Sequence, residues 1–138
     1  MTALVIDASV AIKWVVQEQG TAEALAVRRT SQLAAPDLLS AECANILWKK
    51  VARAELTPEQ AIFAARLLQR ADVELVPMRS LMAAATQLAI DLDHPAYDCM
   101  YLALAVERQT RLVTADERLL RRVGRSGQLA GCVLALGG

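Results

Sequence analysis

Glycine and proline are scarce in this sequence, with six and four of them in 138 residues. So low a content excludes collagen-like repeats and low-complexity disordered chains. Aromatic residues make up only 4%, but hydrophobic residues of all kinds reach 55%, so the chain has enough aliphatic side chains for a core. The length suits one domain, and we expect residues 1–138 to form a single one.

Residues that commonly form disulfides or zinc sites are also few. The three cysteines, Cys43, Cys99 and Cys132, form no CxxC pair, and each lies among apolar residues. This pattern favours buried thiols in a reducing compartment over a disulfide framework. His94 is the only histidine and has no second ligand at zinc spacing. We therefore interpret His94, beside Pro95, as a residue that shapes a turn.

Net charge and long hydrophobic runs are absent as well. Fifteen Lys and Arg balance fifteen Asp and Glu, which excludes a protein held on nucleic acid or membrane by bulk charge alone. No uncharged run reaches the roughly 18 to 20 residues that span a bilayer. Asp7 and Lys13 interrupt the first apolar stretch before it resembles a signal peptide. We expect a cytoplasmic protein that does not contact a membrane.

What the sequence does contain is an alternation of short apolar runs and longer helical patterns. Strand-like runs cover Ala3–Ile6, Leu33–Ala35, Val73–Val76, Leu112–Thr114 and Cys132–Leu136. Helical patterns cover Ser9–Val16, Thr21–Thr30, Leu38–Ala54, Pro58–Ala71, Ser80–Leu92, Tyr97–Gln109 and Asp116–Val123. Strands separated by helices require crossover connections. The sequence therefore predicts an α/β fold: a three-layer α/β/α sandwich around a mainly parallel sheet of four to five strands.

Two of the expected strands are followed by an acid. Asp7 comes directly after the first run, and Asp116 comes two residues after Thr114. The carboxyl ends of parallel strands share one edge of the sheet, where open α/β folds bind their ligands. The simpler interpretation is helix N-capping, for which Asp is a favoured residue. Both interpretations are open for each acid.

A third acid, Asp98, begins a helix whose next eight residues carry no charge. A helix that is apolar on nearly every face is typically buried, which would put Asp98 at the rim of the core. Stabilisation of the helix dipole alone is the alternative role for this residue.

The fourth acid, Glu42, lies on a helix whose expected core stripe is Leu39, Cys43 and Ile46. At 100° per residue Glu42 borders that stripe, with Asn45 and Lys49 along the same edge. A solvated surface charge is the simpler interpretation of Glu42.

If the four acids converge, they need a cation. Two carboxylates about 4 Å apart repel each other by about 4 kcal/mol at an effective dielectric constant of about 20. That is a large part of a domain's stability of roughly 5 to 15 kcal/mol. Oxygen ligands without His or Cys favour Mg²⁺ or Mn²⁺ over zinc.

Four segments together resemble the PIN-domain ribonucleases, and most closely the VapC toxins of bacterial toxin–antitoxin pairs. They are VIDASV (5–10), APDLLSAECAN (35–45), YDCMYLALA (97–105) and LVTADERL (112–119). Any one of them is a weak signal. Four in the family's order and spacing, spread over almost the whole chain, are specific.

The resemblance implies the catalytic and metal-binding residues. Asp7, Asp98 and Asp116 match the family's metal ligands. Glu42 matches either a further ligand or an acid that lies next to the ligands without binding the metal itself. The polar residues that match the lining of the site are Ser9, Asn45 and Thr114. Cys99 departs from the pattern, since many relatives have Ala there, but on the helical count it faces away from the metal.

The resemblance also implies a function: hydrolysis of RNA phosphodiester bonds by water, with Mg²⁺ or Mn²⁺ as cofactor and no covalent intermediate. Such an endoribonuclease is the toxin of a toxin–antitoxin pair and inhibits translation. Its partners would be RNA, a VapB-like antitoxin and a second copy in a homodimer. The alternative is a PIN-like module that binds proteins without catalysis. A haloacid-dehalogenase-type phosphatase is disfavoured, because Ser9 stands where it needs a second carboxylate.

An RNA substrate also needs positive charge close to the site. Six arginines stand against two acids between Arg108 and Arg125. Of these we expect Arg118, Arg121 and Arg122 to contact the RNA backbone. A solvated face is the alternative, because Arg outnumbers Lys twelve to three in the whole chain.

The helical pair from Leu38 to Ala71 carries Trp48, Ile62 and Phe63. These side chains would suit a partner groove, but we expect at least two of them to pack in the core.

Overall fold

A computed structural model describes all of residues 1–138, which form a five-stranded sheet flanked by helices. The strands are β1 (Thr2–Ile6), β2 (Ser31–Pro36), β3 (Val73–Val76), β4 (Arg111–Thr114) and β5 (Val133–Ala135). The α-helices are α1 (Ala8–Ala11), α2 (Thr21–Thr30), α3 (Leu38–Ala52), α4 (Pro58–Gln69), α5 (Met82–Leu92), α6 (Ala96–Glu107) and α7 (Glu117–Gly124). Three short 3₁₀ helices are η1 (Ile12–Trp14), η2 (Met78–Leu81) and η3 (Ala130–Cys132).

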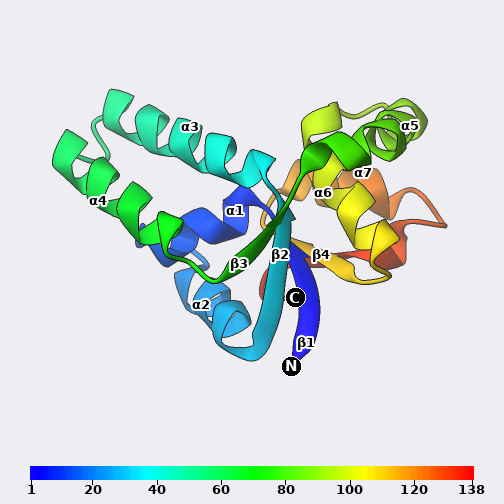
Figure 1. Cartoon of the computed structure of the whole chain (residues 1–138), viewed down its shortest axis with the longest axis horizontal. Coiled ribbons are helices and arrows are strands. Elements are labelled where there is room, and N and C mark those ends of the chain that lie inside the picture. The colour runs from blue at the N-terminus through cyan, green and yellow to red at the C-terminus, as the bar shows by residue number, and fades with distance from the viewer.

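All neighbouring strands pair in parallel, in the order β3-β2-β1-β4-β5. From β1 the chain moves outward through β2 to β3, then crosses back to β4 and continues to β5. Right-handed crossovers in opposite directions place their helices on opposite faces of a sheet. Accordingly α1 to α4 lie on one side and α5 to α7 on the other (Figure 1). The predicted three-layer α/β/α sandwich with a parallel sheet is confirmed.

The reversal of strand order between β1 and β4 creates the place where such sheets bind ligands. The two strands are hydrogen-bonded neighbours, with Ile6 opposite Val113. Both strands end there at the same edge, so the residues that follow them emerge side by side. Because β1 and β4 are covered on both faces, their central side chains are apolar, and Val5, Ile6, Leu112 and Val113 are buried.

The element predictions were accurate except at boundaries and in one register. The expected helix over Ser9–Val16 is the short α1 followed by η1, which ends at Trp14. On α3 the buried residues are Leu39, Cys43 and Leu47, so the expected stripe was wrong at its last position, where Ile46 is only half-buried. Either spacing, i, i+4, i+8 or i, i+4, i+7, keeps the stripe on one face of the helix. Leu47 is selected by packing against Ile12 of η1 and against Ala61 and Ala64 of α4.

The expectation of core packing for Trp48, Ile62 and Phe63 was also wrong. All three are exposed, Trp48 to 63% and Phe63 to 64%. The α3–α4 pair projects away from the sheet (Figure 1), so the outer face of this pair has no layer to pack against. No helix in the structure combines the length and apolar character needed to cross a membrane.

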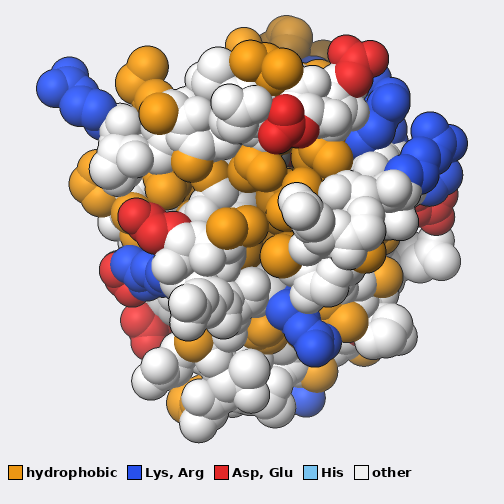
Figure 2. Space-filling model, turned by 90° about the vertical axis from the view of Figure 1, so that its right-hand side faces the viewer, with side chains coloured by type: hydrophobic (Ala, Val, Ile, Leu, Met, Phe, Trp, Pro, Cys, Tyr) orange, Lys and Arg blue, Asp and Glu red, His pale blue; other side chains and the backbone are white.

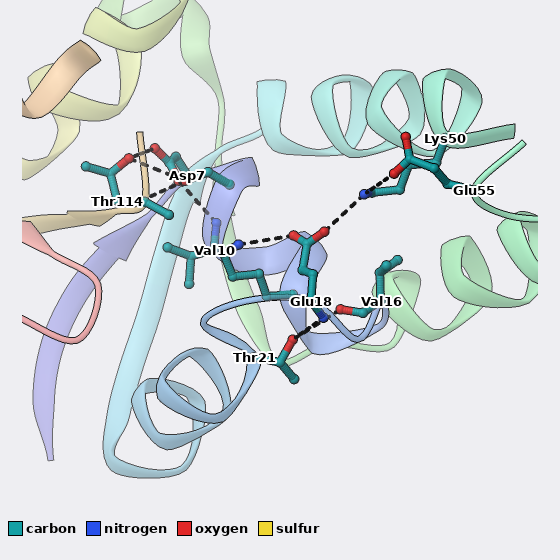
Figure 3. A network of polar contacts seen from close by, with 11 residues as sticks. Asp7, Val10, Val16, Glu18, Thr21, Lys50, Glu55 and Thr114 are labelled. Carbon is teal, nitrogen blue, oxygen red and sulfur yellow. Dashed lines mark hydrogen bonds and ion pairs between the residues drawn. The ribbon is translucent and has the colours of Figure 1, made fainter. Parts of the chain in front are cut away.

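Local signals define the ends of α4 and the base of the α3–α4 pair. Thr57 caps α4 in a complete capping box with Gln60, and Pro58 occupies the first turn. Glu18, just after η1, forms ion pairs with Lys13 and with Lys50 near the end of α3 (Figure 3). These half-buried contacts link the projecting pair to the segment that follows β1.

The helix α6 is the centre of the core. Its residues from Tyr101 to Ala105 are all buried, and it contacts β1, β2, β4 and α5. The prediction of a buried helix is therefore confirmed, and α6 forms a rigid support for the residues of its first turn.

This role predicts a sharp difference between two positions of α6. Leu102→Ala removes a fully buried side chain, and we expect it to lower the free energy of unfolding by about 2 to 5 kcal/mol. Val106→Ala changes a side chain that is 45% exposed and should cost less than about 1 kcal/mol. Urea denaturation followed by circular dichroism measures both, and equal losses would contradict the central position of α6.

Candidate functional site at the carboxyl edge of the sheet

Four elements bring the predicted acids to one cavity of about 470 Å³ at the carboxyl edge of the sheet. Asp7 follows β1, Glu42 lies on α3, Asp98 lies in the first turn of α6, and Asp116 caps α7. All four line the cavity. Two of these acids come from each side of the β1–β4 switch point, so the topology gathers residues that are far apart in sequence.

Asp7 is buried, and its carboxylate accepts hydrogen bonds on both oxygens. The Ser9 and Thr114 hydroxyls each donate to it at 2.5 Å, and the Val10 amide donates at 3.3 Å (Figure 3). The Val10 bond confirms the N-cap interpretation. Asp7 therefore caps α1 and lines the cavity as well. Burial is the main cause that raises the pKa of Asp7 to about 6, and the charge of Asp98 adds to it.

Asp116 also caps a helix. One of its oxygens, Oδ1, accepts from the amides of Arg118 and Leu119 at the start of α7. Its second oxygen, Oδ2, has no protein partner. Capping fixes the carboxylate at the edge of the cavity while leaving one oxygen for a ligand.

Glu42 and Asp98 are each held by a buried donor. The Tyr101 hydroxyl donates to Oε1 of Glu42 at 2.5 Å, and Nε2 of His94 lies 2.6 Å from Oδ2 of Asp98. Burial raises the pKa of Glu42; the Tyr101 bond opposes this shift and the Asp98 charge adds to it. Glu42 is therefore not the freely solvated charge of the simpler interpretation.

The sequence reasoning missed the roles of His94 and Tyr101. His94 shapes the turn before α6 as expected, but its buried ring also contacts Asp98. Its Nδ1 is buried without a partner, which suits a ring that carries its proton on Nε2 and donates to Asp98. The i, i+4 spacing of His94 and Asp98 was the signal available in the sequence; nothing local pointed to the Tyr101 contact with Glu42.

The donor set fits a hard divalent cation. Glu42, Asp98 and Asp116 each keep one oxygen without a hydrogen-bond partner, and all three line the same cavity. As they stand, no three His, Cys, Asp or Glu side chains form a group tight enough to hold a metal ion. Mg²⁺ keeps several waters and needs only one or two direct carboxylates, so widely spaced oxygens suit it better than they suit a fully protein-ligated metal.

The remaining predicted residues separate into those that reach the site and those that do not. Ser9 and Thr114 contact Asp7, and Asn45 lines the cavity together with Lys49. Cys99 is buried and does not line the cavity, as the helical count indicated. Burial raises the pKa of Cys99 to about 11, which disfavours the reactive thiolate form beside Asp98.

The arginine-rich segment is divided between the two ends of the sheet. The side chains of Arg118, Arg121 and Arg122 belong to α7, which starts at the cavity. At the opposite end, Arg108 follows the last turn of α6 and pairs with Glu74, and Arg111 begins β4. Only the α7 arginines lie on an element that begins at the cavity.

Three comparisons relate the chain to known proteins. The model of the PIN domain family matches residues 4–126. A crystal structure of PAE2754 from Pyrobaculum aerophilum is similar, with a TM-score of 0.66 and 19% identity over 99% of this chain and 85% of that one. VapBC2 from Rickettsia felis, in a crystal structure bound to a DNA fragment from their promoter, matches with a TM-score of 0.67 and 11% identity over 97% and 98% of the two chains. No curated protein matches in sequence.

The raised pKa of Asp7 predicts how stability depends on pH in the absence of divalent cations. In the unfolded chain this carboxyl ionises near pH 3.8, but in the folded protein it ionises near 6. The folded state therefore loses stability as pH rises through this window, by up to about 3 kcal/mol. Asp7→Asn removes the charge and keeps a good N-cap, so it should stabilise the protein at pH 7 and not at pH 4.

Urea denaturation in EDTA at the two pH values measures this difference. Asp72→Asn, an exposed acid before β3, is the matched control and should change stability little at either pH. A variant Asp7→Asn that is no more stable than the wild type at pH 7 would contradict the assigned cost of burying this charge.

Proposed function

Because the chain belongs to the PIN-domain family, we propose that it is a metal-dependent endoribonuclease of the VapC toxin type, with residues 1–138 acting as one nuclease domain. The single observation that carries the proposal is the cavity at the β1–β4 switch point, lined by Asp7, Glu42, Asp98 and Asp116. Carboxylates gathered at this position suit phosphodiester hydrolysis through Mg²⁺ or Mn²⁺.

The free oxygens of Asp98 and Asp116, with the carboxylate of Asp7, would hold the cation. When bound, the cation supplies polarisation of a phosphoryl oxygen and a water of lowered pKa. Ser9 and Thr114 orient Asp7 through their hydroxyls. Tyr101 holds Oε1 of Glu42 and leaves Oε2 free, which supports a role for Glu42 in orienting the attacking water and accepting its proton.

The arginines of α7 supply the contacts to the RNA backbone in this proposal. Arg118, Arg121 and Arg122 stand at i, i+3 and i+4 of α7, and Arg125, directly after the helix, continues the same face at i+7. The opposite side of α7 is buried through Leu119 and Val123. Arg121 is 4.0 Å from Glu117 in an exposed pair, which is too weak an interaction to keep it from a phosphate.

The exposed apolar surfaces suit the partners of a VapC-type toxin. Trp48, Ile62 and Phe63 lie on α3 and α4, and Ile62 also lines a largely apolar cavity of about 620 Å³. We assign this surface to an antitoxin helix, by analogy with the VapBC complex. Met82 and Ile90 of α5 are exposed. The side of the molecule that Figure 2 shows carries hydrophobic side chains between charged ones, and the exposed apolar residues of α5 suit contact with a second copy.

A toxin of this type would cleave RNA in the cytoplasm and inhibit translation. The competing function is a PIN-like module that binds proteins without catalysis. Two observations favour this alternative. The acids form no tight three-residue group, and the structure has exposed apolar surfaces. Metal-dependent cleavage separates the two.

The ribonuclease proposal predicts cleavage of RNA by antitoxin-free protein in Mg²⁺ or Mn²⁺, abolished by EDTA. Loss of a partner outside the ligand shell commonly costs 10- to 100-fold, so Asp98→Asn, which changes a ligand, should reduce the rate by about 100-fold or more. Asp72→Asn, at the other end of the sheet, should retain the wild-type rate. Electrophoresis of labelled structured and unstructured RNAs measures cleavage, with circular dichroism as the check on folding.

Wild-type activity in Asp98→Asn, or activity that survives EDTA, would overturn the assigned site. Protein that neither binds Mn²⁺ nor cleaves any RNA would favour the non-catalytic module.

The proposed α7 surface predicts a change in the salt dependence of RNA binding. On single strands each neutralised phosphate contributes about 0.7 to the slope of log affinity against log salt. The double variant Arg121→Gln with Arg122→Gln should therefore lower the slope by about 1.4. The matched pair Arg108→Gln with Arg111→Gln, at the opposite end of the sheet, should leave it unchanged. Fluorescence anisotropy at several salt concentrations measures the slopes. Equal slopes for the two double variants would show that the α7 arginines do not contact RNA.

A further inference from the structure

The cavity is also lined by an exposed aromatic residue that holds none of the acids. Tyr97, immediately before Asp98 in the first turn of α6, is 67% exposed, and its hydroxyl makes no hydrogen bond within the protein. An aromatic ring in this state gains little from folding, because it buries little area and satisfies no partner. Its backbone is nevertheless rigid, since the next residues of α6 form the centre of the core.

The α3 side of the cavity is mixed apolar and polar. Leu38, Ala41 and Ile46 line it together with Tyr97, and Glu42 belongs to the same helix face. These positions recur at i, i+3, i+4 and i+8, which is one stripe of α3. The cavity therefore combines acids with an apolar wall and an exposed aromatic ring.

Further along the same stripe lie Asn45 and Lys49, at i+7 and i+11 from Leu38. The Asn45 amide makes no hydrogen bond, and Lys49 makes no ion pair, although Lys13 and Lys50 nearby are both paired. An amide with free donor and acceptor atoms suits the edge of a nucleobase, and an unpaired ammonium suits a phosphate.

We propose that Tyr97, with the apolar stripe of α3, forms a subsite for one unpaired nucleobase beside the proposed catalytic acids. In this subsite the base stacks on Tyr97, Asn45 contacts its edge, and Lys49 contacts a neighbouring phosphate. The inference rests on the proposed ribonuclease function and deepens it, because it names the residues of this chain that would receive one base of the RNA.

The stacked arrangement follows from the chemistry of the wall. Every base has a face that stacks on an aromatic ring, and proteins use this contact for single-stranded RNA. A base inside a duplex already stacks on its neighbours and cannot offer its face to Tyr97. A cavity of about 470 Å³ lies within the usual range for small-molecule sites, roughly 300 to 1,000 Å³.

The first test measures cleavage kinetics of one RNA sequence, alone and annealed to its complement, in Mg²⁺. Tyr97→Leu should raise KM for the unpaired RNA about 10-fold or more, since stacking on one base contributes about 5- to 150-fold in affinity. Its kcat should stay within about threefold of wild type. Tyr97→Phe keeps the ring and should resemble the wild type. Phe63→Leu removes an equally exposed ring of α4, outside the cavity. Because Phe63 belongs to the surface assigned to the antitoxin, this variant should leave cleavage by antitoxin-free protein unchanged.

The second test detects stacking without turnover, in an Asp116→Asn background. RNAs that carry 2-aminopurine at successive positions report a stacked base by loss of fluorescence. Quenching should occur at one position on binding, persist with Tyr97→Phe and disappear with Tyr97→Leu.

The outcomes separate the subsite from the function. If the wild type cleaves RNA but Tyr97→Leu changes KM and quenching no more than Phe63→Leu does, the subsite is wrong and the ribonuclease proposal stands. Equal cleavage of the duplex and the single strand would also overturn the subsite. If the wild type neither binds nor cleaves RNA, the function and the subsite fail together.

Discussion

The gathering of four carboxylates in one cavity is the constraint on which the rest of this structure depends, and the charge of Asp98 helps to raise the pKa of both Asp7 and Glu42. The order β3-β2-β1-β4-β5 brings the ends of β1 and β4 together, and helices from both faces of the sheet add further acids. Each acid is given its own hydrogen-bond donors: hydroxyls for Asp7, Tyr101 for Glu42, His94 for Asp98 and helix amides for Asp116. No lysine or arginine forms an ion pair with any of the four, so the cavity keeps its negative charge for a cation.

The helix α6 links the stability of the fold to the geometry of this cavity. It fills the core through residues 101–105, and the same helix carries Tyr97 and Asp98 at its start and Tyr101 one turn later. Because a helix packed on all sides moves little, Asp98 is fixed by the core, by His94 and by its place in the first turn. The cost of building the cavity is seen at Asp7, whose pKa is raised by burial, and binding of a cation would offset that cost.

Several features were predictable because their signals are local. The capping box at Thr57, the apolar run that makes α6 a buried helix, and the alternation of strands and helices all depend on residues close in sequence. The four acids that the family motifs contain all line one cavity. What went wrong also has a local cause: the pattern of α3 allowed Ile46 and Leu47 equally, and it could not show that the outer side of the α3–α4 pair has no neighbour to cover Trp48 and Phe63.

The sequence by itself determined the fold class, the carboxyl-edge position of Asp7 and Asp116, and the oxygen-only chemistry of the candidate site, because strand ends and residue types can be read directly. Only the tertiary structure decided which donor holds which acid. Tyr101 and Glu42 are 59 residues apart, and Thr114 and Asp7 are 107 apart. Contacts between such residues depend on strand register and helix packing, which bring side chains within 2.5 Å or leave them apart for reasons that no local pattern contains.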